Sequence, residues 1–405
     1  MDTIVPAGDP AAVILFSELT YAQAIRYTTA SKLAAVGLSK DDPSNFVQLF
    51  EDTADKSGEK ILYELIYNPF GPGIAGDNVI AGNEVPLTYD QDALFINQLR
   101  QSMLLKGMMS QQRVPFSLRD KARNGESNWM RTMIEYGLMN QAAGNSAAAL
   151  LPYVGSSGSD SGQYNFTGMQ APIEPSADHQ IFPQGATTES TVGTDPRYSF
   201  TLDLIPDFVA LAQGNLSVPI KPVVISDLEI PGIGFLDHLQ VKDMKKQFDN
   251  GQWGNIMAAA LQGGQVAGNP IFTGMLGIFD GVPLHQNTYL PWGDGVTTNL
   301  ILNPATKTKV AAPNSLYNPG NNTNYSYATT NIGRGVFLGA QAVAFAVGMA
   351  DGTPDNPLRV KWVEEPLDAN NQLRVTCGMI FGFHKTQFAG SDYALIEFST
   401  FVSTT

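Results

Sequence analysis

The stretch PFSLRDKARNGESNWMRTMIEYGLMNQAAG, residues 115–144, decides the fold because it contains the clearest helix in the sequence. Ser117-Leu-Arg-Asp120 has the form of a capping box, and Pro115 stands just before it. Apolar residues then recur at three- and four-residue spacing, at Leu118, Ala122, Trp129, Met130, Met133, Ile134 and Leu138. Gly144 and Asn145 end the pattern. At ~1.5 Å per residue the predicted helix is about 40 Å long, which makes it an architectural element.

A long β-hairpin is predicted directly before this helix, over residues 58–107. Ile61, Tyr63, Leu65 and Tyr67 alternate along one face of a first strand. A tip rich in glycine and proline follows, and a second extended run covers Leu87–Leu105. Both faces of this pair are half polar, and an isolated hairpin is marginally stable in water. We therefore expect the hairpin to lie on a neighbouring surface.

The remaining chain is predicted to alternate helices and strands. Residues 1–57 form an N-terminal arm with a helix at Ser17–Val36, and residues 151–200 form an excursion rich in glycine and serine. The other predicted helices are Thr201–Ala212, Val241–Leu261 with Trp253 on its buried side, and Arg334–Met349 with many small residues. The other predicted strands are Val218–Ile225, Ile278–His285, Leu373–His384 and Tyr393–Val402, and a turn is predicted at Asp351–Asn356.

The composition is acidic and poor in charged residues. The 405 residues include 38 acids and 24 bases, which gives a net charge of −14, and only 15% of residues are charged. A protein that grips nucleic acid needs clustered lysine and arginine. The nearest cluster, Lys242, Lys245 and Lys246, is interleaved with Asp243 and Asp249. Direct DNA binding is therefore disfavoured.

Cysteine usage and hydropathy narrow the class further. The single cysteine, Cys377, excludes an intramolecular disulfide. No apolar run reaches the roughly 18 to 20 residues that span a bilayer. The longest run, Val336–Ala350, is predicted to be a buried helix, and the acidic start with Asp2 and Asp9 lacks the basic region of a secretory signal. We expect no contact with a membrane.

No pattern of catalytic residues stands out. The sequence holds no P-loop, no Gly-x-Ser-x-Gly elbow and no His-Glu-x-x-His motif, and its four histidines are scattered. Cys377 and His384 lie seven residues apart on one predicted strand, where a core cysteine is favoured over a nucleophile with its base. Asp178-His179 and Asp237-His238 are interpreted as polar surface pairs, because adjacent residues seldom face each other.

One acidic cluster remains, formed by Glu364, Glu365 and Asp368. It could hold a cation, but pairing with Arg359 and Lys361 is the favoured interpretation. Asp351–Asn356 lacks the later glutamate of an EF-hand and is interpreted as a turn. We therefore expect no catalytic residue, no cofactor and no metal.

Three blocks stand in a fixed order along the chain: the hairpin tip Gly76–Glu84, the run Lys106–Arg119 with the helix that contains Trp129, and Asn269–Gly277 with Asp280-Gly-Val. They resemble motifs of the major capsid protein family typified by coliphage N4, which has the HK97 capsid fold. Phe337–Ala342 and Trp362–Glu365 look like its later blocks. The resemblance covers roughly residues 60–400. Residues 1–55 match loosely, and residues 146–200 match poorly.

The resemblance implies an α+β, HK97-like fold in five parts. These are the arm (1–57), the extended hairpin or E-loop (58–107), the long spine helix with a peripheral domain (108–200), a mixed α/β axial domain (201–350) and strands that return to the peripheral domain (351–405). It implies a major capsid protein of a tailed phage, located in the virion and assembled in the host cytoplasm.

The implied partners are further copies of the chain, in hexamers and pentamers, together with portal, scaffolding or decoration proteins. The shell would enclose double-stranded DNA without binding it specifically. The expected inter-subunit contact residues lie at the hairpin tip and at the start of the helix: Asp77, Asn78, Gly82, Asn83, Glu84, Arg113, Arg119 and Arg123. A polysaccharide hydrolase is the alternative, and it would need two carboxylates in a cleft lined with aromatic residues.

Overall fold

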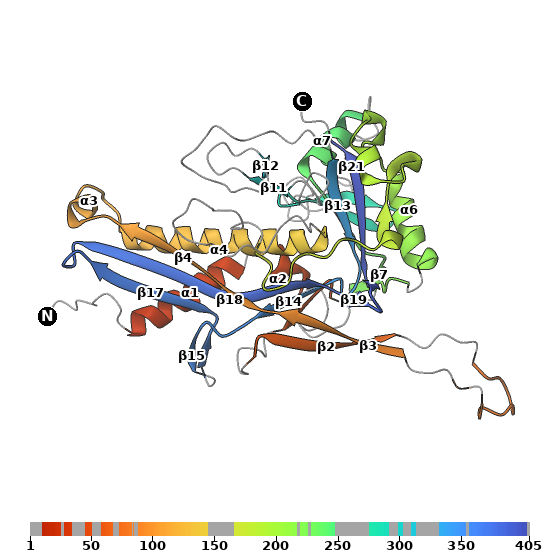
Figure 1. Cartoon of the computed structure of the whole chain (residues 1–405), viewed down its shortest axis with the longest axis horizontal. Coiled ribbons are helices and arrows are strands. Elements are labelled where there is room, and N and C mark those ends of the chain that lie inside the picture. The colour runs from red at the N-terminus through yellow and green to blue at the C-terminus, as the bar shows by residue number, and fades with distance from the viewer. Residues whose placement is uncertain are drawn as a thin grey trace.

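The computed structural model is elongated, with one sheet and a long helix along its length and a second sheet at one end (Figure 1). It describes residues 10–25, 28–34, 45–50, 58–67, 73–82, 84, 88–144, 166–216, 219–225, 228–247, 275–290, 299–302, 309–312, 332–353 and 356–402. The predicted α+β class is confirmed.

The predicted long helix is confirmed as α4, Leu118–Ala142. The Ser117 side chain accepts a hydrogen bond from the Asp120 N–H at 3.2 Å, which caps the first turn. Gly144 follows the C-cap residue in the left-handed region, with φ +58°, and so ends the helix where the sequence indicates. The 25 residues span about 37 Å.

The first sheet, called the long sheet below, lies against α4 (Figure 1). Its central strand is β18, Gln372–Lys385, which forms antiparallel pairs with β4 (Asn97–Leu105), β17 (Val360–Leu367) and β14 (Val343–Val347). β1, Val47–Phe50, adds a parallel strand beside β14. The sheet buries Trp362, Phe345, Phe381 and Phe383, and the rings of Phe345 and Phe383 stack at 4.4 Å.

The second sheet has six strands in the order β5-β21-β13-β8-β10-β9. Their bounds are Gln180–Ile181 (β5), Leu395–Phe401 (β21), Ile332–Leu338 (β13), Ile233–Leu236 (β8), Val282–Gln286 (β10) and Met275–Phe279 (β9). Helix α6, Leu204–Ala210, packs on it through Phe208, whose ring stacks on Phe398 at 4.6 Å. One continuous hydrophobic core runs through both sheets, so the two halves stabilise each other.

The hairpin extends away from both sheets (Figure 1). β2, Lys60–Tyr67, pairs with β3, Thr88–Phe95, over the whole length of both strands. The prediction that Leu87–Leu105 forms one hairpin strand is wrong, because the chain divides at Ile96 and β4 joins the long sheet. The projecting part of the predicted segment 58–107 therefore ends at Phe95.

The predicted helix at Arg334–Met349, and with it the buried helix at Val336–Ala350, is wrong. This stretch forms β13 and β14, joined by a turn in which Gln341 adopts φ +62°. Every residue of both strands is buried, so no alternation of polar and apolar residues reveals the strand period. Gly339 allows close packing, as predicted, but in the turn after β13, where an added Cβ would lie 2.2 Å from Ile220. Gly335 does the same within β13, where an added Cβ would lie 2.2 Å from the Phe398 ring of β21.

Other predicted elements are confirmed with shifted bounds. The arm helix is α1, Pro10–Ile25, followed by α2, Thr29–Leu33, and Val218–Ile225 contains β6, Val223–Ile225. Val241–Leu261 begins as α7, His238–Gln247, whereas the later part with Trp253 lies outside the described residues. The prediction of a single strand at Ile278–His285 is wrong, because the chain turns at Asp280 and Gly281, both with positive φ, and forms the β9–β10 hairpin. The predicted turn at Asp351–Asn356 begins and ends in strand, in β15 (Asp351–Thr353) and at the start of β16 (Asn356–Leu358), which pair with each other.

The two sheets exchange strands across the predicted part boundaries. β14 comes from residues 201–350 but belongs to the long sheet, and β21 comes from residues 351–405 but belongs to the six-stranded sheet. In the part of the chain that the structure describes, no helix has the length and apolar character needed to cross a membrane.

Candidate assembly surfaces

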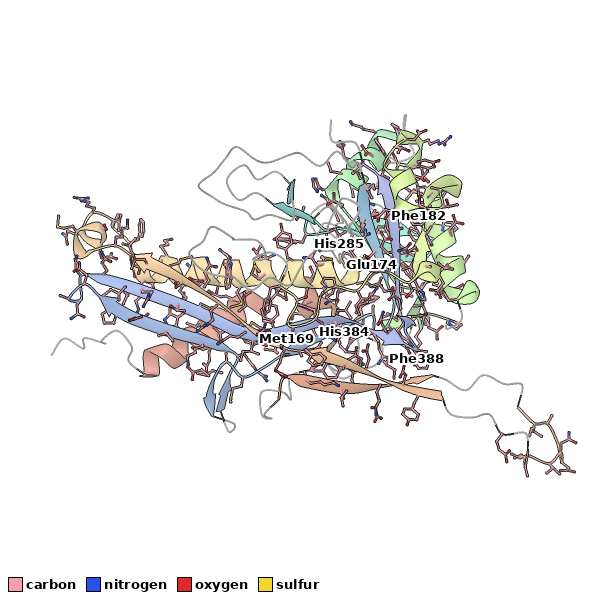
Figure 2. The ribbon with its side chains drawn as sticks, viewed as in Figure 1. Met169, Glu174, Phe182, His285, His384 and Phe388 are labelled. Atoms are coloured by element: carbon pink, nitrogen blue, oxygen red, sulfur yellow. The ribbon has the colours of Figure 1, made fainter. Side chains whose placement is uncertain are left out.

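The base of the hairpin is clamped to the long sheet by Asp92. One carboxylate oxygen of Asp92 lies 3.0 Å from His384 Nε2, and the other accepts hydrogen bonds from the Tyr63 hydroxyl at 3.0 Å and the Gln387 N–H at 2.9 Å. Asp90 accepts a further bond from the Ala389 N–H at 2.7 Å. Figure 2 shows His384 and Phe388 beside this base. These contacts fix the direction in which the hairpin leaves the body.

The pKa values at this clamp reflect the same contacts. Burial alone raises the pKa of Asp92, but the hydrogen bond and charge of His384 outweigh it and hold the pKa below its ordinary value. The pKa of Tyr63 is raised well above its ordinary value by burial and by the neighbouring Asp92. Asp92 is therefore the ionised acceptor and Tyr63 the donor.

The tip of the hairpin exposes apolar side chains. Val79 is 71% exposed and Ile80 64% exposed, whereas Tyr63 and Leu65 near the base are buried. Of the predicted contact residues, Asn78 bonds the Ala75 carbonyl at 2.8 Å, and Gly82 donates its N–H to Glu84 at 2.8 Å. Asp77 is exposed, and Asn83 lies outside the described residues. The tip thus has local order of its own without being covered by the body.

The opposite end of the molecule exposes a second apolar group. It consists of Leu104, Met109 and Phe116, on β4, on α3 (Met108–Gln112) and just before α4. We call this group the end patch. The segment Leu104–Lys121 holds four bases and one acid, whereas the tip segment Gly73–Glu84 holds two acids and no base. Figure 1 places the hairpin tip and α3 at the two ends of the long axis.

The three predicted arginines have different surroundings. Arg113 is exposed at the end of α3, and Arg123 is half-buried on α4. Arg119 Nε lies 2.6 Å from the buried carboxylate of Glu364 on β17, which also accepts the Trp362 indole N–H at 3.0 Å. Because Glu364 lies on β17, this ion pair holds Arg119 against its own subunit, and the expected contact of Arg119 with a neighbouring subunit stays a prediction.

The acidic cluster forms ion pairs, as predicted, but with other partners. Glu364 pairs with Arg119 and Glu365 with Arg374, whereas Lys361 Nζ lies 3.6 Å from Asp351. Cross-strand register explains the second pair, because Glu365 stands opposite Arg374 in the β17–β18 ladder. Of the expected partners, Arg359 donates to the Val347 carbonyl at 3.4 Å, and Lys361 pairs with Asp351.

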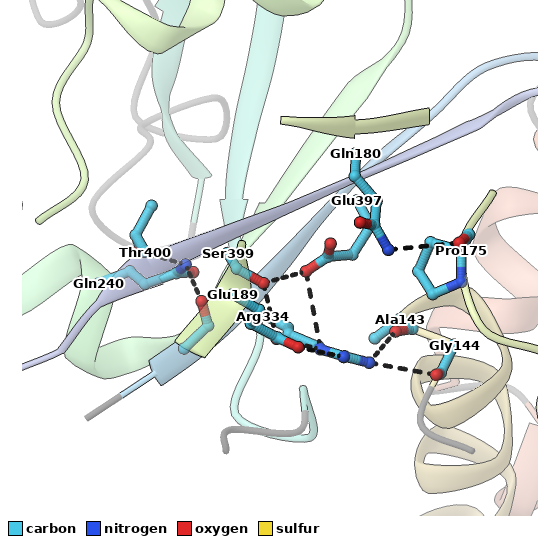
Figure 3. A network of polar contacts seen from close by, with 11 residues as sticks. Ala143, Gly144, Pro175, Gln180, Glu189, Gln240, Arg334, Glu397, Ser399 and Thr400 are labelled. Atoms are coloured by element: carbon cyan, nitrogen blue, oxygen red, sulfur yellow. Dashed lines mark hydrogen bonds and ion pairs between the residues drawn. The ribbon is translucent and has the colours of Figure 1, made fainter. Parts of the chain in front are cut away.

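A buried polar network joins the end of α4 to the six-stranded sheet (Figure 3). Arg334 of β13 makes two contacts with Glu189 of α5 (Glu189–Val192), at 2.6 and 2.7 Å. It also donates to the carbonyls of Ala143 and Gly144 at 3.0 and 3.1 Å, where the helix dipole is negative. This network holds α4 against the sheet that the hairpin does not touch.

Sequence reasoning did not identify this network or the Asp92 clamp. Two signals were available for the network: a charged residue stands inside an apolar run at Arg334, and another at Glu397. Such residues are almost never fully buried unless they are paired, which would have indicated an internal ion pair. Asp92 carries no comparable signal, because its partner His384 is 292 residues away.

The residues considered for catalysis are separated or serve as structural contacts. Cys377 and His384 lie on β18 at an odd separation, which puts them on opposite faces roughly 23 Å apart. Burial also raises the pKa of the Cys377 thiol, so the thiolate is disfavoured. The core interpretation of Cys377 is confirmed by its burial.

The two Asp-His pairs do face each other, so the prediction that they do not is wrong. His179 Nδ1 lies 3.0 Å from Asp178, and His238 Nδ1 lies 3.0 Å from Asp237. One member of each pair is buried. Asp237 also accepts the Leu239 N–H at 3.2 Å while Gln240 accepts the Asp237 N–H at 2.9 Å, which is the reciprocal capping of α7.

A pocket of about 550 Å³ lies between α1 and α4. Its lining residues are Leu19, Ala22, Gln23, Asn124, Ser127, Asn128 and Arg131. A glycosidase needs two carboxylates there, and this lining has none. Within the described ranges, no three His, Cys, Asp or Glu side chains are grouped closely enough to hold a metal ion.

Comparison with solved structures identifies the fold. The chain superposes on the capsid of Ralstonia phage GP4 with a TM-score of 0.66 at 21% identity, covering 100% of this chain and 99% of that one. The capsid of cyanophage Pam1 matches with a TM-score of 0.60 at 17% identity, over 94% of both chains. The fold is therefore that of the HK97-like phage capsids, as predicted.

Sequence comparison supports the same assignment. A major capsid protein of Pseudomonas phage KPP25 is 25% identical over 371 residues, which cover 87% of this chain and 84% of the relative. The model of the phage capsid protein family matches residues 4–404. None of these matches is a polysaccharide hydrolase, so the alternative has no support. Because the family match extends over nearly the whole sequence, the chain belongs to the phage capsid protein family.

Proposed function

We propose that this chain is the major subunit of a tailed-phage head, and that its copies join as hexamers and pentamers into an icosahedral shell around double-stranded DNA. The observation that supports this best is the projecting hairpin, whose Val79 and Ile80 are exposed far from the core of their own subunit. Exposed apolar groups of this kind mark protein interfaces. The narrower assignment to the family of coliphage N4 stays a prediction.

The end patch supports a head-to-tail contact between copies. Leu104, Met109 and Phe116 offer an apolar surface for Val79 and Ile80 of a second copy. Lys106, Arg113 and Lys121 are exposed around it and complement Asp77 and Glu84 of the tip, although Asp120 and Asp368 offset part of that charge. A contact between two different surfaces of identical subunits closes into a ring when its rotation is suitable. Hexamers and pentamers are such rings.

Charge reversal tests this contact. A tip variant carries Asp77→Lys with Glu84→Lys, and an end variant carries Arg113→Glu with Lys121→Glu. Each variant alone should form fewer shells by sedimentation and negative-stain microscopy, and a chain with all four changes should recover them. A control that reverses two exposed acids outside the tip, Asp207→Lys with Glu229→Lys, should assemble like the original chain.

The outcomes separate the two levels of the proposal. Shells that form equally well from every variant would contradict the tip-to-end contact and leave the capsid role intact. An original chain that stays monomeric under all assembly conditions would count against self-assembly itself. Portal, scaffolding and decoration proteins stay predicted partners, and their binding is tested by co-expression with the neighbouring genes.

The acidic composition supports an interior surface that encloses DNA without holding it. With a net charge of −14, the chain offers few sites for phosphate contacts. Unassembled protein titrated against duplex DNA at about 50 mM salt should bind no tighter than roughly micromolar. Tighter binding would contradict this part of the proposal. The capsid role requires no catalytic step, cofactor or metal.

A further inference from the structure

A serine hydroxyl lies between two carboxyl groups at the junction of α4 and the six-stranded sheet (Figure 3). Ser399 Oγ is 2.6 Å from Glu397 Oε1 and 2.8 Å from Glu189 Oε1. A hydroxyl has one proton and can donate it to only one of these oxygens. An ionised carboxylate has no proton to donate. The two short contacts therefore need one further proton, carried by one of the two glutamates.

Glu397 is the better carrier of that proton. Glu189 faces the Arg334 guanidinium through both carboxylate oxygens, at 2.6 and 2.7 Å, and this bidentate contact favours its ionised form. Glu397 is 1% exposed, and Arg334 Nε is 3.8 Å from it. Burial is also the largest influence on the Glu397 carboxyl and raises its pKa.

The charges around Glu397 also indicate that it carries the extra proton. Lys385, at the end of β18, has its ammonium 2.8 Å from the carboxylate of Asp392, which lies on β20 (Ser391–Asp392), and both side chains are fully buried. Arg334 is matched by Glu189 in the same way. Two cations thus face three carboxyls, and Glu397 is the third. β5 brings the uncharged Gln180 opposite Glu397, and the adjacent turn Ala177–His179 brings His179, which contacts Asp178.

We propose that Glu397 is a neutral carboxylic acid that donates its proton to Ser399, that Ser399 donates in turn to Glu189, and that loss of this proton loosens the junction between α4 and the six-stranded sheet. Ionised Glu397 would leave a third negative charge buried beside two cations that are already paired. It would also face the Ser399 oxygen without a hydrogen between them, at 2.6 Å. Arg334, which joins Glu189 to the last carbonyls of α4, would then be shared between two competing carboxylates.

The sign of the pH dependence follows from the raised pKa. The stability that protonated Glu397 contributes is fully present below the ordinary glutamate pKa, and it is lost as the pH rises through the raised value. The junction should therefore be tighter in weak acid and looser in weak alkali. The proton on Glu397 is a property of the folded subunit and does not depend on shell formation.

Infrared difference spectroscopy tests the proton directly, because a carboxylic acid has a carbonyl absorption that a carboxylate lacks. The original chain minus Glu397→Gln should show one such band at about pH 6, and the band should disappear in weak alkali. Glu365→Gln serves as the matched control, because Glu365 is 52% exposed in its pair with Arg374 and should give no band. Absence of the Glu397 band at about pH 6 would overturn the proposal.

Hydrogen exchange tests the consequence at the junction. Between about pH 6 and pH 9, exchange at the end of α4 and in β13, corrected for its intrinsic pH dependence, should speed up in the original chain. In Glu397→Gln, whose amide can donate to Ser399 at any pH, the corrected exchange should stay constant. If the corrected exchange of both proteins depended equally on pH, the proposed effect of the Glu397 proton on the junction would be contradicted. Should Glu397→Gln fail to fold, Ser399→Ala should keep the band but shift it, because the acid loses its acceptor.

Discussion

The base and the tip of the β2–β3 hairpin use similar apolar residues for opposite purposes. At the base, Leu65 and Leu94 are buried in the core of their own subunit, whereas at the tip Val79 and Ile80 are exposed. The base also ties its acids to the body through Asp90 and Asp92, whereas Glu84 at the tip accepts a hydrogen bond from the tip's own backbone, at the Gly82 N–H. Folding of the subunit therefore uses the apolar residues of the base, and the exposed apolar residues of the tip are left for the proposed contact with a second copy.

Truncation of a leucine at the base should have the largest effect on stability. Leu94→Ala removes a fully buried side chain and should lower the free energy of unfolding by about 2–5 kcal/mol. Ile80→Ala at the tip should change it by less than about 0.5 kcal/mol. Denaturant titration of the unassembled subunits measures both. A large loss of stability for Ile80→Ala would show that the tip also packs on its own subunit.

The clamp acid should have the next largest effect. In Asp92→Asn an amide nitrogen replaces one of the two oxygens that face Tyr63, Gln387 and His384, so the unfolding free energy should fall by about 1–3 kcal/mol. The pKa of Asp92 is lowered, so its contribution is present above the ordinary aspartate pKa and is lost as the pH falls through the lowered value. Unfolding measured from neutral to acid pH should therefore show a smaller decline for the variant than for the original chain.

A buried acid without such partners should respond in the opposite direction. Glu126 of α4 is fully buried, neither carboxylate oxygen has a hydrogen-bond partner among the described residues, and burial raises its pKa to about 7. Its stabilising contribution is present below the ordinary glutamate pKa and is lost as the pH rises through about 7. Glu126→Gln should then stabilise the subunit by about 1–2 kcal/mol at alkaline pH and by less in acid. Equal effects in acid and alkali would contradict this assignment.

Local patterns predicted the parts of the fold that are determined by neighbouring residues. The capping box at Ser117 and the alternation from Ile61 to Tyr67 needed only adjacent residues, and both elements are confirmed. The prediction failed at β13 and β14 because every residue of both strands is buried, so polar and apolar residues do not alternate along them to mark the strand period. It also failed at β4, which was assigned to the second strand of the hairpin although it pairs with β18 in the long sheet.

On the candidate surfaces, too, the sequence predicted what neighbouring residues determine and missed what tertiary contacts determine. Motifs similar to a known family located the tip, because Gly76 and Gly82 there adopt positive φ values that favour glycine. The partner of Arg119 was not predictable, because Glu364 is 245 residues away and only the packing of α4 against β17 brings them together. Whether a charge pairs inside the subunit or with a neighbour is decided by tertiary structure, which residue spacing does not encode.

Substitutions on the outward face of the hairpin strands should have the smallest effect on folding, and they test how far the difference between base and tip extends along the strands. Leu62 and Tyr89 lie on this face, 59% and 63% exposed, opposite the face that holds Tyr63 and Leu65. Leu62→Thr with Tyr89→Thr keeps the preference for strand and should change the unfolding free energy of the subunit by less than about 0.5 kcal/mol.

If the whole hairpin lies on a neighbour, shells of this variant should dissociate at a lower denaturant concentration than shells of the original chain. Because the two side chains expose apolar area along the strands, we expect that decrease. Lys60→Thr, at the start of the same strand, is the control and should leave shell dissociation unchanged. Equal dissociation of the variant and the original chain would confine the contact to the tip, and the outward face would then be ordinary exposed surface.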